Sequence, residues 1–181
     1  QFTINFSASD TATGVASLSA TLNGSLVSNG QTATLTKPGS NTFTVTATDV
    51  AGNNSTQSVT FSVTYNFIGF LDPINSDGSS IFKLGSTVPI KFQLTACNGV
   101  AVTTAVSTLG VFKITDVVLG TMEVVSVDSS GSANTDNLFR YSDPNYIYNL
   151  GTKPYSQGTY RLQATLDDGT VHTVNISLMT K

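Results

Sequence analysis

Residues able to break a covalent bond are scarce in this sequence, which has one histidine, one cysteine and one glutamate. Cys97 and His172 could in principle act as a nucleophile and its base. The simpler interpretation is structural for both residues. Cys97 would be a small buried side chain after the strand that ends at Leu94, and His172 would share a strand face with Val174. Glycoside hydrolysis needs two positioned carboxylates, but Glu123 is alone and the aspartates fall mostly in turn segments. We therefore predict that the chain is not an enzyme.

Oxygen ligands for calcium are the second chemistry that the sequence offers. Asp10 and Asp49 each end a run with strand alternation, and Gly52-Asn53 permits a tight backbone beside the second one. Calcium takes carboxylate, carbonyl and amide oxygens from loops, although this spacing is not that of an EF-hand. The alternative is that both aspartates cap turns through their own backbone. The sequence thus requires no cofactor, and it predicts Asp10, Asp49 and Asn53 as the candidate calcium site.

Clustered tyrosines offer a third chemistry, the binding of carbohydrate. Exposed aromatic rings can stack on sugar C–H groups while polar neighbours bind the hydroxyls. The predicted carbohydrate-binding residues are Tyr141, Tyr146, Tyr148, Tyr155 and Arg140. The alternative is that Tyr146 and Tyr148 share one strand face and pack into the core, with their hydroxyls at the rim. The absence of tryptophan also argues against a dedicated carbohydrate binder.

Composition restricts the partners and the compartment. Charged residues make up 10% of the chain and the net charge is −3, without the clustered Lys and Arg that nucleic acid requires. No apolar run approaches the roughly 20 residues of a membrane span. The single cysteine excludes an internal disulfide, which suits an exported bacterial protein. We predict an extracellular or cell-surface location, and the start at Gln1 without a leader predicts a piece of a longer protein.

Alternating apolar and polar residues indicate short strands through the first third of the chain. Each run places apolar side chains on one face and Ser, Thr or Asn on the other. Turn signals such as Asn23-Gly24 and Ala51-Gly52-Asn53 separate the runs. Short strands of this kind, each with one wet face, are typical of a β-sandwich. The apolar positions are Phe2, Ile4, Phe6 and Ala8; Leu18, Ala20 and Leu22; Ala33 and Leu35; Phe43, Val45 and Ala47; and Val59, Phe61 and Val63.

Strand patterns resume after a short connection at Tyr65-Asn66. Pro89 lacks the backbone N–H that a sheet ladder needs, so we expect it at an edge or a bulge. The last hairpin could have a two-residue turn at Asp168-Gly169 or a three-residue loop that also contains Asp167. Only the longer loop keeps apolar residues opposite one another, so we predict this loop with Gly169 in a left-handed bulge. The other expected strands cover residues 88–94, 111–114, 122–127, 137–141 and 146–150.

Residues 1–64 resemble the bacterial immunoglobulin-like repeats of long surface proteins and secreted hydrolases. The similarity covers the whole segment and implies a fold but no particular function. The residues that carry it are Ala8-Ser9-Asp10 with Gly14-Val15, Leu22-Asn23-Gly24, and the run from Gly39-Ser40-Asn41-Thr42-Phe43 to Thr48-Asp49-Val50-Ala51-Gly52-Asn53.

Residues 65–181 resemble the C-terminal modules named for a Pro-x-Lys-Phe motif, which here reads Pro89-Ile90-Lys91-Phe92. The family often has a cysteine before the arginine of its last segment, where this chain has Tyr160, and this leaves Cys97 without a partner. The resemblance implies a terminal, non-catalytic module of exported bacterial proteins. Other similar stretches are Phe67-Ile68-Gly69-Phe70, Leu138-Phe139-Arg140-Tyr141, Tyr146-Ile147-Tyr148 and Leu166-Asp167-Asp168-Gly169-Thr170-Val171-His172.

These observations predict an all-β chain of two tandem immunoglobulin-like antiparallel β-sandwiches, residues 1–64 and 65–181. The predicted function is that of a spacer or terminal module of a larger secreted or surface-displayed protein. The alternatives are a carbohydrate-binding accessory module of a secreted hydrolase and a subunit of a self-assembling surface fibre. The expected partners are the neighbouring domains of the parent chain and, in the first alternative, a polysaccharide. The isolated fragment is expected to be a monomer.

Overall fold

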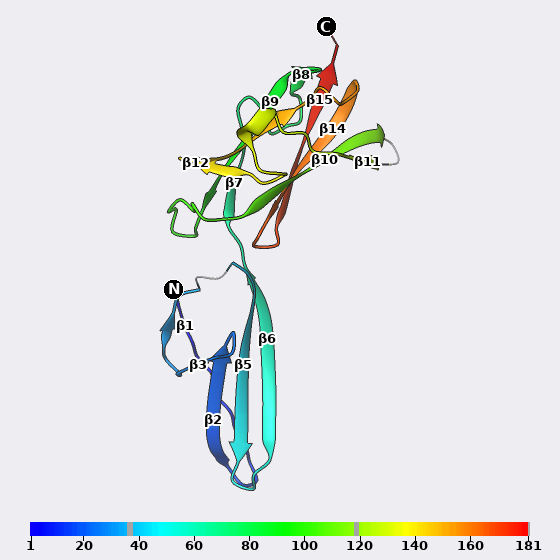
Figure 1. The fold of residues 1–181 in the computed structure, drawn as a ribbon. Helices are drawn as coiled ribbons and strands as arrows, with labels where there is room; N and C mark the ends of the chain where they lie inside the picture. The colour runs from blue at the N-terminus through cyan, green and yellow to red at the C-terminus, as the bar shows by residue number, and fades with distance from the viewer. Residues whose placement is uncertain (36–37, 118–119, 181) are drawn as a thin grey trace. The chain divides into compact units, whose positions relative to one another are not determined.

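The computed structural model describes residues 1–35, 38–117 and 120–180. The chain separates into two compact units, unit 1 (Gln1–Thr64) and unit 2 (Tyr65–Lys181). Both are built from strands, and Figure 1 shows how these are arranged within each unit. The fold class predicted from the sequence, two tandem immunoglobulin-like β-sandwiches, is confirmed. Among the described residues, no helix has the length and apolar character needed to cross a membrane.

Unit 1 has one long sheet and one very short sheet. The long sheet has the antiparallel order β3-β2-β5-β6 and the short one pairs β1 with β4. The long sheet thus has no second sheet of similar length in the described part of this unit. The strands are β1 (Phe2–Thr3), β2 (Val15–Leu22), β3 (Ser25–Val27), β4 (Thr32–Ala33), β5 (Gly39–Asp49) and β6 (Asn54–Val63).

The wet face of the long sheet is a ladder of hydroxyl groups. Threonines alternate with apolar residues along β5, and their cross-strand partners on β6 are also polar. Thr44 Oγ1 lies 2.8 Å from Ser58 Oγ, and Thr48 Oγ1 donates to Asn54 Oδ1 at 2.6 Å. Such side-chain pairs contribute to sheet stability. Hydrogen bonds between uncharged side chains of neighbouring strands therefore stabilise this face.

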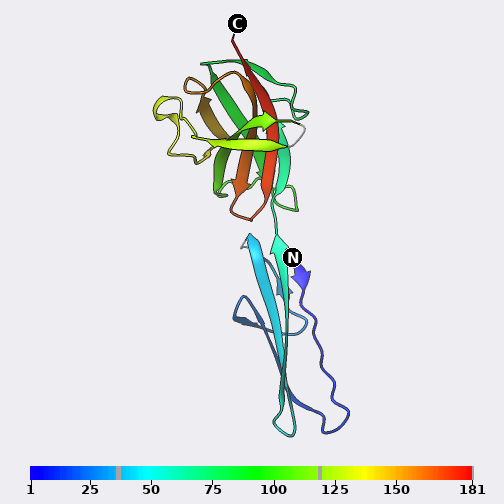
Figure 2. The ribbon, with the colours of Figure 1, turned by 90° about the vertical axis from the view of Figure 1, so that its right-hand side faces the viewer.

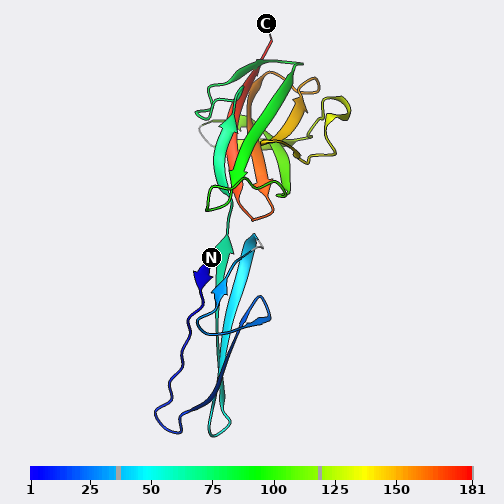
Figure 3. The same cartoon turned by 90° about the vertical axis from the view of Figure 1, so that its left-hand side faces the viewer.

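The first segment of the chain departs from the predicted strand over residues 2–8. Only Phe2 and Thr3 pair as strand, and Figures 2 and 3 show the following segment running beside the long sheet as irregular chain. Ile4 N donates to Gln31 O at 2.9 Å, and Phe6 N donates to Asn29 Oδ1 at 3.0 Å. A loop and a side-chain amide therefore take the place of a ladder partner, although Ile4 is still buried as its parity predicts.

Unit 2 is a sandwich of a five-stranded and a four-stranded sheet, in the orders β11-β10-β14-β15-β8 and β12-β13-β9-β7. All pairs are antiparallel except β15 with β8, which run parallel. A single 3-10 turn, η1 (Gly131–Ala133), lies between β11 and β12. The strands are β7 (Asn66–Leu71), β8 (Ile81–Lys83), β9 (Thr87–Thr95), β10 (Ser107–Asp116), β11 (Thr121–Val125), β12 (Arg140–Ser142), β13 (Asn145–Gly151), β14 (Gly158–Leu166) and β15 (Val171–Met179).

The two sheets of unit 2 enclose a dry aromatic and aliphatic core. Phe92 lies within it, with its ring stacked on Tyr146 at 5.2 Å and edge-on to Phe139 at 4.9 Å. Offset or edge-on aromatic pairs of this kind add to the stability gained from burial. The buried core residues are Phe70, Ile74, Val88, Ile90, Phe92, Leu94, Ala105, Leu109, Val111, Phe139, Tyr146, Tyr148, Leu150, Tyr160, Leu162, Ala164, Leu166, Val174, Ile176 and Leu178.

Pro89 lies in an interior strand, which the edge prediction did not anticipate. β9 has β13 on one side, where Pro89 is opposite Asn149, and β7 on the other. Pairing with β7 extends only to Lys91 opposite Leu71. Pro89 therefore has a strand neighbour on one side only, which resolves the conflict with its missing N–H.

The predicted register of the last hairpin is confirmed. Ala164 pairs with His172 and Leu162 with Val174, and Gly169 has a φ of 87°. The loop also contains a residue that the sequence analysis treated only as part of the turn. Asp168 is buried, and its carboxylate accepts hydrogen bonds from Thr170 N at 2.8 Å and from Tyr65 N at 2.6 Å. This carboxylate therefore fixes the first residue of unit 2 to its last hairpin.

Candidate functional site

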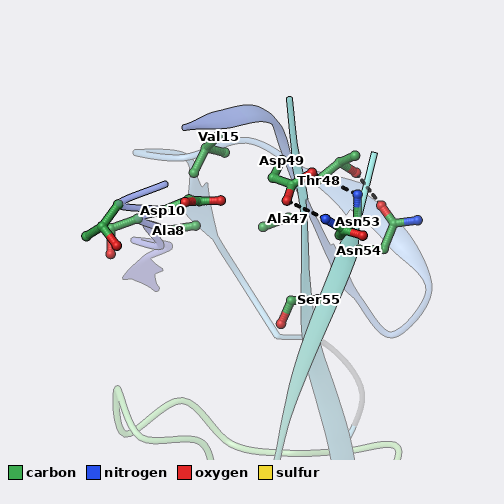
Figure 4. A pocket seen from close by; sticks show the side chains of 11 residues that line it. Ala8, Asp10, Val15, Ala47, Thr48, Asp49, Asn53, Asn54 and Ser55 are labelled. Carbon is green, nitrogen blue, oxygen red and sulfur yellow. Dashed lines mark hydrogen bonds between the residues drawn. The ribbon is translucent and has the colours of Figure 1, made fainter. Parts of the chain in front are cut away.

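Asp49, at the end of β5, organises the turn that leads into β6. Its carboxylate accepts hydrogen bonds from Asn53 N and Asn53 Nδ2, both at 2.8 Å (Figure 4). Gly52 has a φ of 90°, the left-handed conformation that brings the backbone back to the aspartate. These hydrogen bonds from the Asn53 side chain and backbone hold the pKa of Asp49 below its usual value.

Asp10 organises a second turn in the same way. Its Oδ1 accepts hydrogen bonds from Ala12 N at 2.6 Å and Thr13 N at 3.2 Å, and Thr13 Oγ1 donates to Oδ2 at 3.3 Å. The backbone hydrogen bond from Ala12, followed by that from Thr13, lowers the pKa of Asp10, while the negative charge of Asp49 opposes this shift. The two carboxylates are therefore near enough to repel each other.

Asp10, Asp49 and Asn53 line one open pocket of about 380 Å³, so the structure brings the predicted calcium ligands together. Their oxygens are of the type that calcium prefers. The hydrogen bonds above also provide the turn-capping role that was the alternative. Across the described residues, no group of three or more His, Cys, Asp or Glu side chains is placed to hold a metal. Calcium at this pocket remains a prediction.

Burial corrects two members of the predicted carbohydrate-binding set. Tyr146 is 1% exposed and Tyr148 is 0% exposed, so neither ring presents a face to a sugar. Tyr146 Oη donates to Val102 O at 3.0 Å and accepts from Ala105 N at 3.0 Å, while Tyr148 Oη donates to Asp136 O at 2.9 Å. Both rings lie on the inner face of β13 because their parity matches that of Leu150, and their hydroxyls are satisfied at the rim.

The remaining members of the set are divided between two places. Arg140 and Tyr141 lie on β12 at the edge of the four-stranded sheet, where Tyr141 Oη donates to Asp143 Oδ1 at 2.9 Å. Tyr155 follows β13 and stacks on Tyr160 of the five-stranded sheet, with ring centroids 5.3 Å apart. The five predicted residues therefore do not form one aromatic patch.

Cys97 is exposed, and the prediction that it is a small buried residue is wrong. It lies beyond the end of β9 in a turn closed by Ala96 N donating to Val100 O at 2.8 Å, which carries its side chain out of the core. His172 is half-buried and stacks flat on Phe67 with ring centroids 3.9 Å apart. Burial lowers the pKa of His172. Its position is thus explained by packing on Phe67.

Comparison with known proteins gives distant structural similarities alone. No family model and no curated protein sequence matches the chain. A β-glucuronidase of Parabacteroides merdae aligns over 91% of this chain at 9% identity and a TM-score of 0.37, and the chain spans only 21% of its length. Domains 4 and 5 of the S-layer protein SbsC align over 90% of this chain and 70% of that one, at 14% identity and a TM-score of 0.35. Tandem immunoglobulin repeats of Dlar align over 93% of this chain and 85% of that one, at 15% identity and a TM-score of 0.29. At these TM-scores the similarities assign no function.

Proposed function

We propose that this chain is a non-catalytic extracellular spacer and terminal module of a larger secreted or surface-displayed protein. Unit 1 would be an immunoglobulin-like repeat and unit 2 a module of the Pro-x-Lys-Phe type. Their partners would be the neighbouring domains of the parent chain. A spacer acts mechanically, so its function depends on resistance to bending and unfolding.

The observation that carries this proposal is the length of the connection between the units. β6 ends at Val63 and β7 begins at Asn66, so only Thr64 and Tyr65 lie between them. Tyr65 has little freedom because its N–H is bound by the buried carboxylate of Asp168 at 2.6 Å. Short connections restrict the motion of the parts that they join, whereas flexible linkers are long and rich in Gly and Ser.

The proposal is tested by inserting a Gly-Ser-Gly-Ser segment between Thr64 and Tyr65. NMR relaxation of the unmodified chain is expected to give similar rotational correlation times for the two units. The insertion is expected to give each unit a shorter correlation time of its own, because the added residues are flexible. The control is the same insertion in the exposed turn between Asn98 and Gly99, which leaves the connection intact. Independent tumbling of the two units in the unmodified chain would exclude a stiff spacer.

A further inference from the structure

Two pockets of unit 2 lie along the same pair of chain segments. One, which we term the aromatic pocket, has a volume of about 380 Å³ and is lined by Lys113, Glu123, Val124, Val125, Ser126, Pro154, Tyr155, Ser156 and Tyr160. The other, the hydroxyl pocket, has about 230 Å³ and is lined by Gly85, Ser86, Thr87, Asp128, Ser129, Ser130, Gly131, Gly151 and Lys153. Lys153 and Pro154 are neighbours in the chain, and Val127 alone separates Ser126 from Asp128. The two pockets are therefore adjacent along these two chain segments.

Backbone hydrogen bonds hold the wall of the hydroxyl pocket in place. Gly151 N donates to Asp128 O at 2.8 Å, and Ser130 N donates to Asn149 O at 3.0 Å, which attaches this wall to the end of β13. Ser130 Oγ lies 2.7 Å from Thr87 Oγ1 at the start of β9. The hydroxyl groups are thus oriented before any ligand arrives, which lowers the entropy cost of binding.

Gly151 lets the Asp128 carboxylate lie against the backbone of β13. A Cβ atom at Gly151 would be 2.5 Å from Asp128 Oδ2, closer than real Cβ atoms approach. Gly151 is also buried, so a side chain there could not turn away freely. The glycine therefore keeps a half-buried acceptor group in a pocket whose other side chains are hydroxyls and Lys153.

The aromatic pocket offers a fixed ring next to charged groups. Tyr155 is half-buried, with its ring stacked on Tyr160 at 5.3 Å and 18°, and its hydroxyl donates to Ser126 O at 2.9 Å. Burial raises the pKa of Tyr155 to about 12, so this hydroxyl stays protonated and remains a donor. Lys113 Nζ is held in place by Ser156 Oγ at 2.6 Å. A ring fixed on one face and at its hydroxyl provides apolar surface without loss of side-chain freedom.

We propose that these two adjacent pockets bind a neutral polysaccharide chain. The charged groups that line them, Lys113, Glu123, Asp128 and Lys153, are two cations and two anions, which favours no net charge on the ligand. Oriented hydroxyls, carboxylates and ammonium groups together supply both donors and acceptors, as the hydroxyls of a sugar require. Successive sugar units of one chain would occupy the two pockets, with apolar C–H surface against Tyr155. This site goes beyond the proposed spacer function and does not depend on it.

The test is NMR titration of the ¹⁵N-labelled 181-residue chain with neutral oligosaccharides prepared from cellulose, xylan, starch and chitin. Binding of at least one of them is expected to shift the amide signals of Gly131, Gly151 and Ser156 in a saturable way. Asp128→Ala and Gly151→Ala are expected to weaken this binding about tenfold, which is the usual effect of losing one hydrogen bond to a charged group. Tyr155→Ala is expected to weaken it to a similar extent.

The matched control is Tyr141→Ala, which removes a half-buried tyrosine of β12 that lines neither pocket and should leave the affinity unchanged. Circular dichroism melting curves identify any variant that fails to fold, and Asp128→Asn then replaces Asp128→Ala as a variant of the same shape. The proposal is overturned if none of the four oligosaccharides shifts the three amides, or if Asp128→Ala and Tyr155→Ala bind as the unmodified chain does. The correlation times of the two units provide a separate readout, so the failure of one proposal leaves the other standing.

Discussion

Units 1 and 2 follow the same alternating sequence pattern but bury very different amounts of apolar surface. Among the described residues of unit 1, the buried hydrophobic side chains are Ile4, Ala20 and Ala33, whereas unit 2 encloses a continuous core built around Phe92. Val59 of β6 is 60% exposed even though it alternates correctly with polar neighbours. Alternation thus determines which side chains share a face, but a second sheet of similar length determines whether that face is dry.

The short sheet of unit 1 covers its long sheet only in part. Leu22, Phe43, Val59 and Phe61 line an apolar pocket of about 380 Å³ together with residues from Phe2 to Asn5. The hydrogen bonds of the strands and the hydroxyl ladder of β5 and β6 must therefore supply more of the stability of unit 1 than of unit 2. Four predictions sharpen this comparison, beginning with the largest expected effect and ending with those at Asp49.

Truncating one phenylalanine in each unit is the most direct test. Phe92→Ala should lower the free energy of unfolding of unit 2 by about 3–5 kcal/mol, because it leaves a cavity in a closed core. Phe43→Ala should cost unit 1 only about 1–2 kcal/mol, since its ring is half-buried and loses less apolar contact. Urea unfolding followed by NMR signals of each unit measures both values in one chain. Equal losses in the two units would mean that unit 1 is as well packed as unit 2.

The sequence predicted those features that depend on neighbouring residues in a single strand or hairpin. The strands around Phe43, Val59 and Phe92 and the register of the last hairpin are present as predicted. The strand expected to extend to Ala8 stops at Thr3, because its partner β4 begins at Thr32 and the chain before it forms a turn in which Gln31 N donates to Ser28 O. The two adjacent pockets of unit 2 were also missed, since Asp128 and Gly151 meet only when the segment after β11 attaches to β13. No local pattern carries that information.

Asp168 should contribute more to the free energy of unfolding of unit 2 than an ordinary residue of a surface turn. Asp168→Ala removes a buried carboxylate that accepts hydrogen bonds from Tyr65 N, Thr170 N and Thr170 Oγ1. Hydrogen bonds to charged groups are each worth more than neutral ones, so a loss of about 2–4 kcal/mol in the free energy of unfolding is expected. The neighbouring Asp167 provides the control, because it is exposed and hydrogen-bonds the Tyr65 side chain rather than its backbone N–H. Asp167→Ala should therefore change this value by less than about 1 kcal/mol. Comparable losses for the two variants would show that the carboxylate does not anchor Tyr65.

The smallest expected effect concerns the turn at Asp49 in unit 1. Hydrogen bonds from the Asn53 side chain and backbone lower the pKa of Asp49 below the ordinary value of 3.8. Folding therefore favours the ionised form, so this contribution is present above pH 3.8 and is lost as the pH falls through the folded-state pKa. Asp49→Asn should remove that part of the acid sensitivity of unit 1. Thermal melting of unit 1 between pH 5 and pH 2 measures the change.

The same variant separates turn capping from calcium binding, because the two roles respond differently to the ion. If Asp10, Asp49 and Asn53 bind calcium, millimolar calcium chloride should raise the melting temperature of unit 1 by a few degrees, since a ligand that binds only the folded state stabilises it. Asp49→Asn and EDTA should each abolish this increase, while magnesium chloride at the same ionic strength controls for screening. Asp49 would have the turn-capping role alone if calcium does not change the melting temperature and the variant loses the acid sensitivity. The hydroxyl ladder and its turns would then stabilise unit 1 without a metal ion.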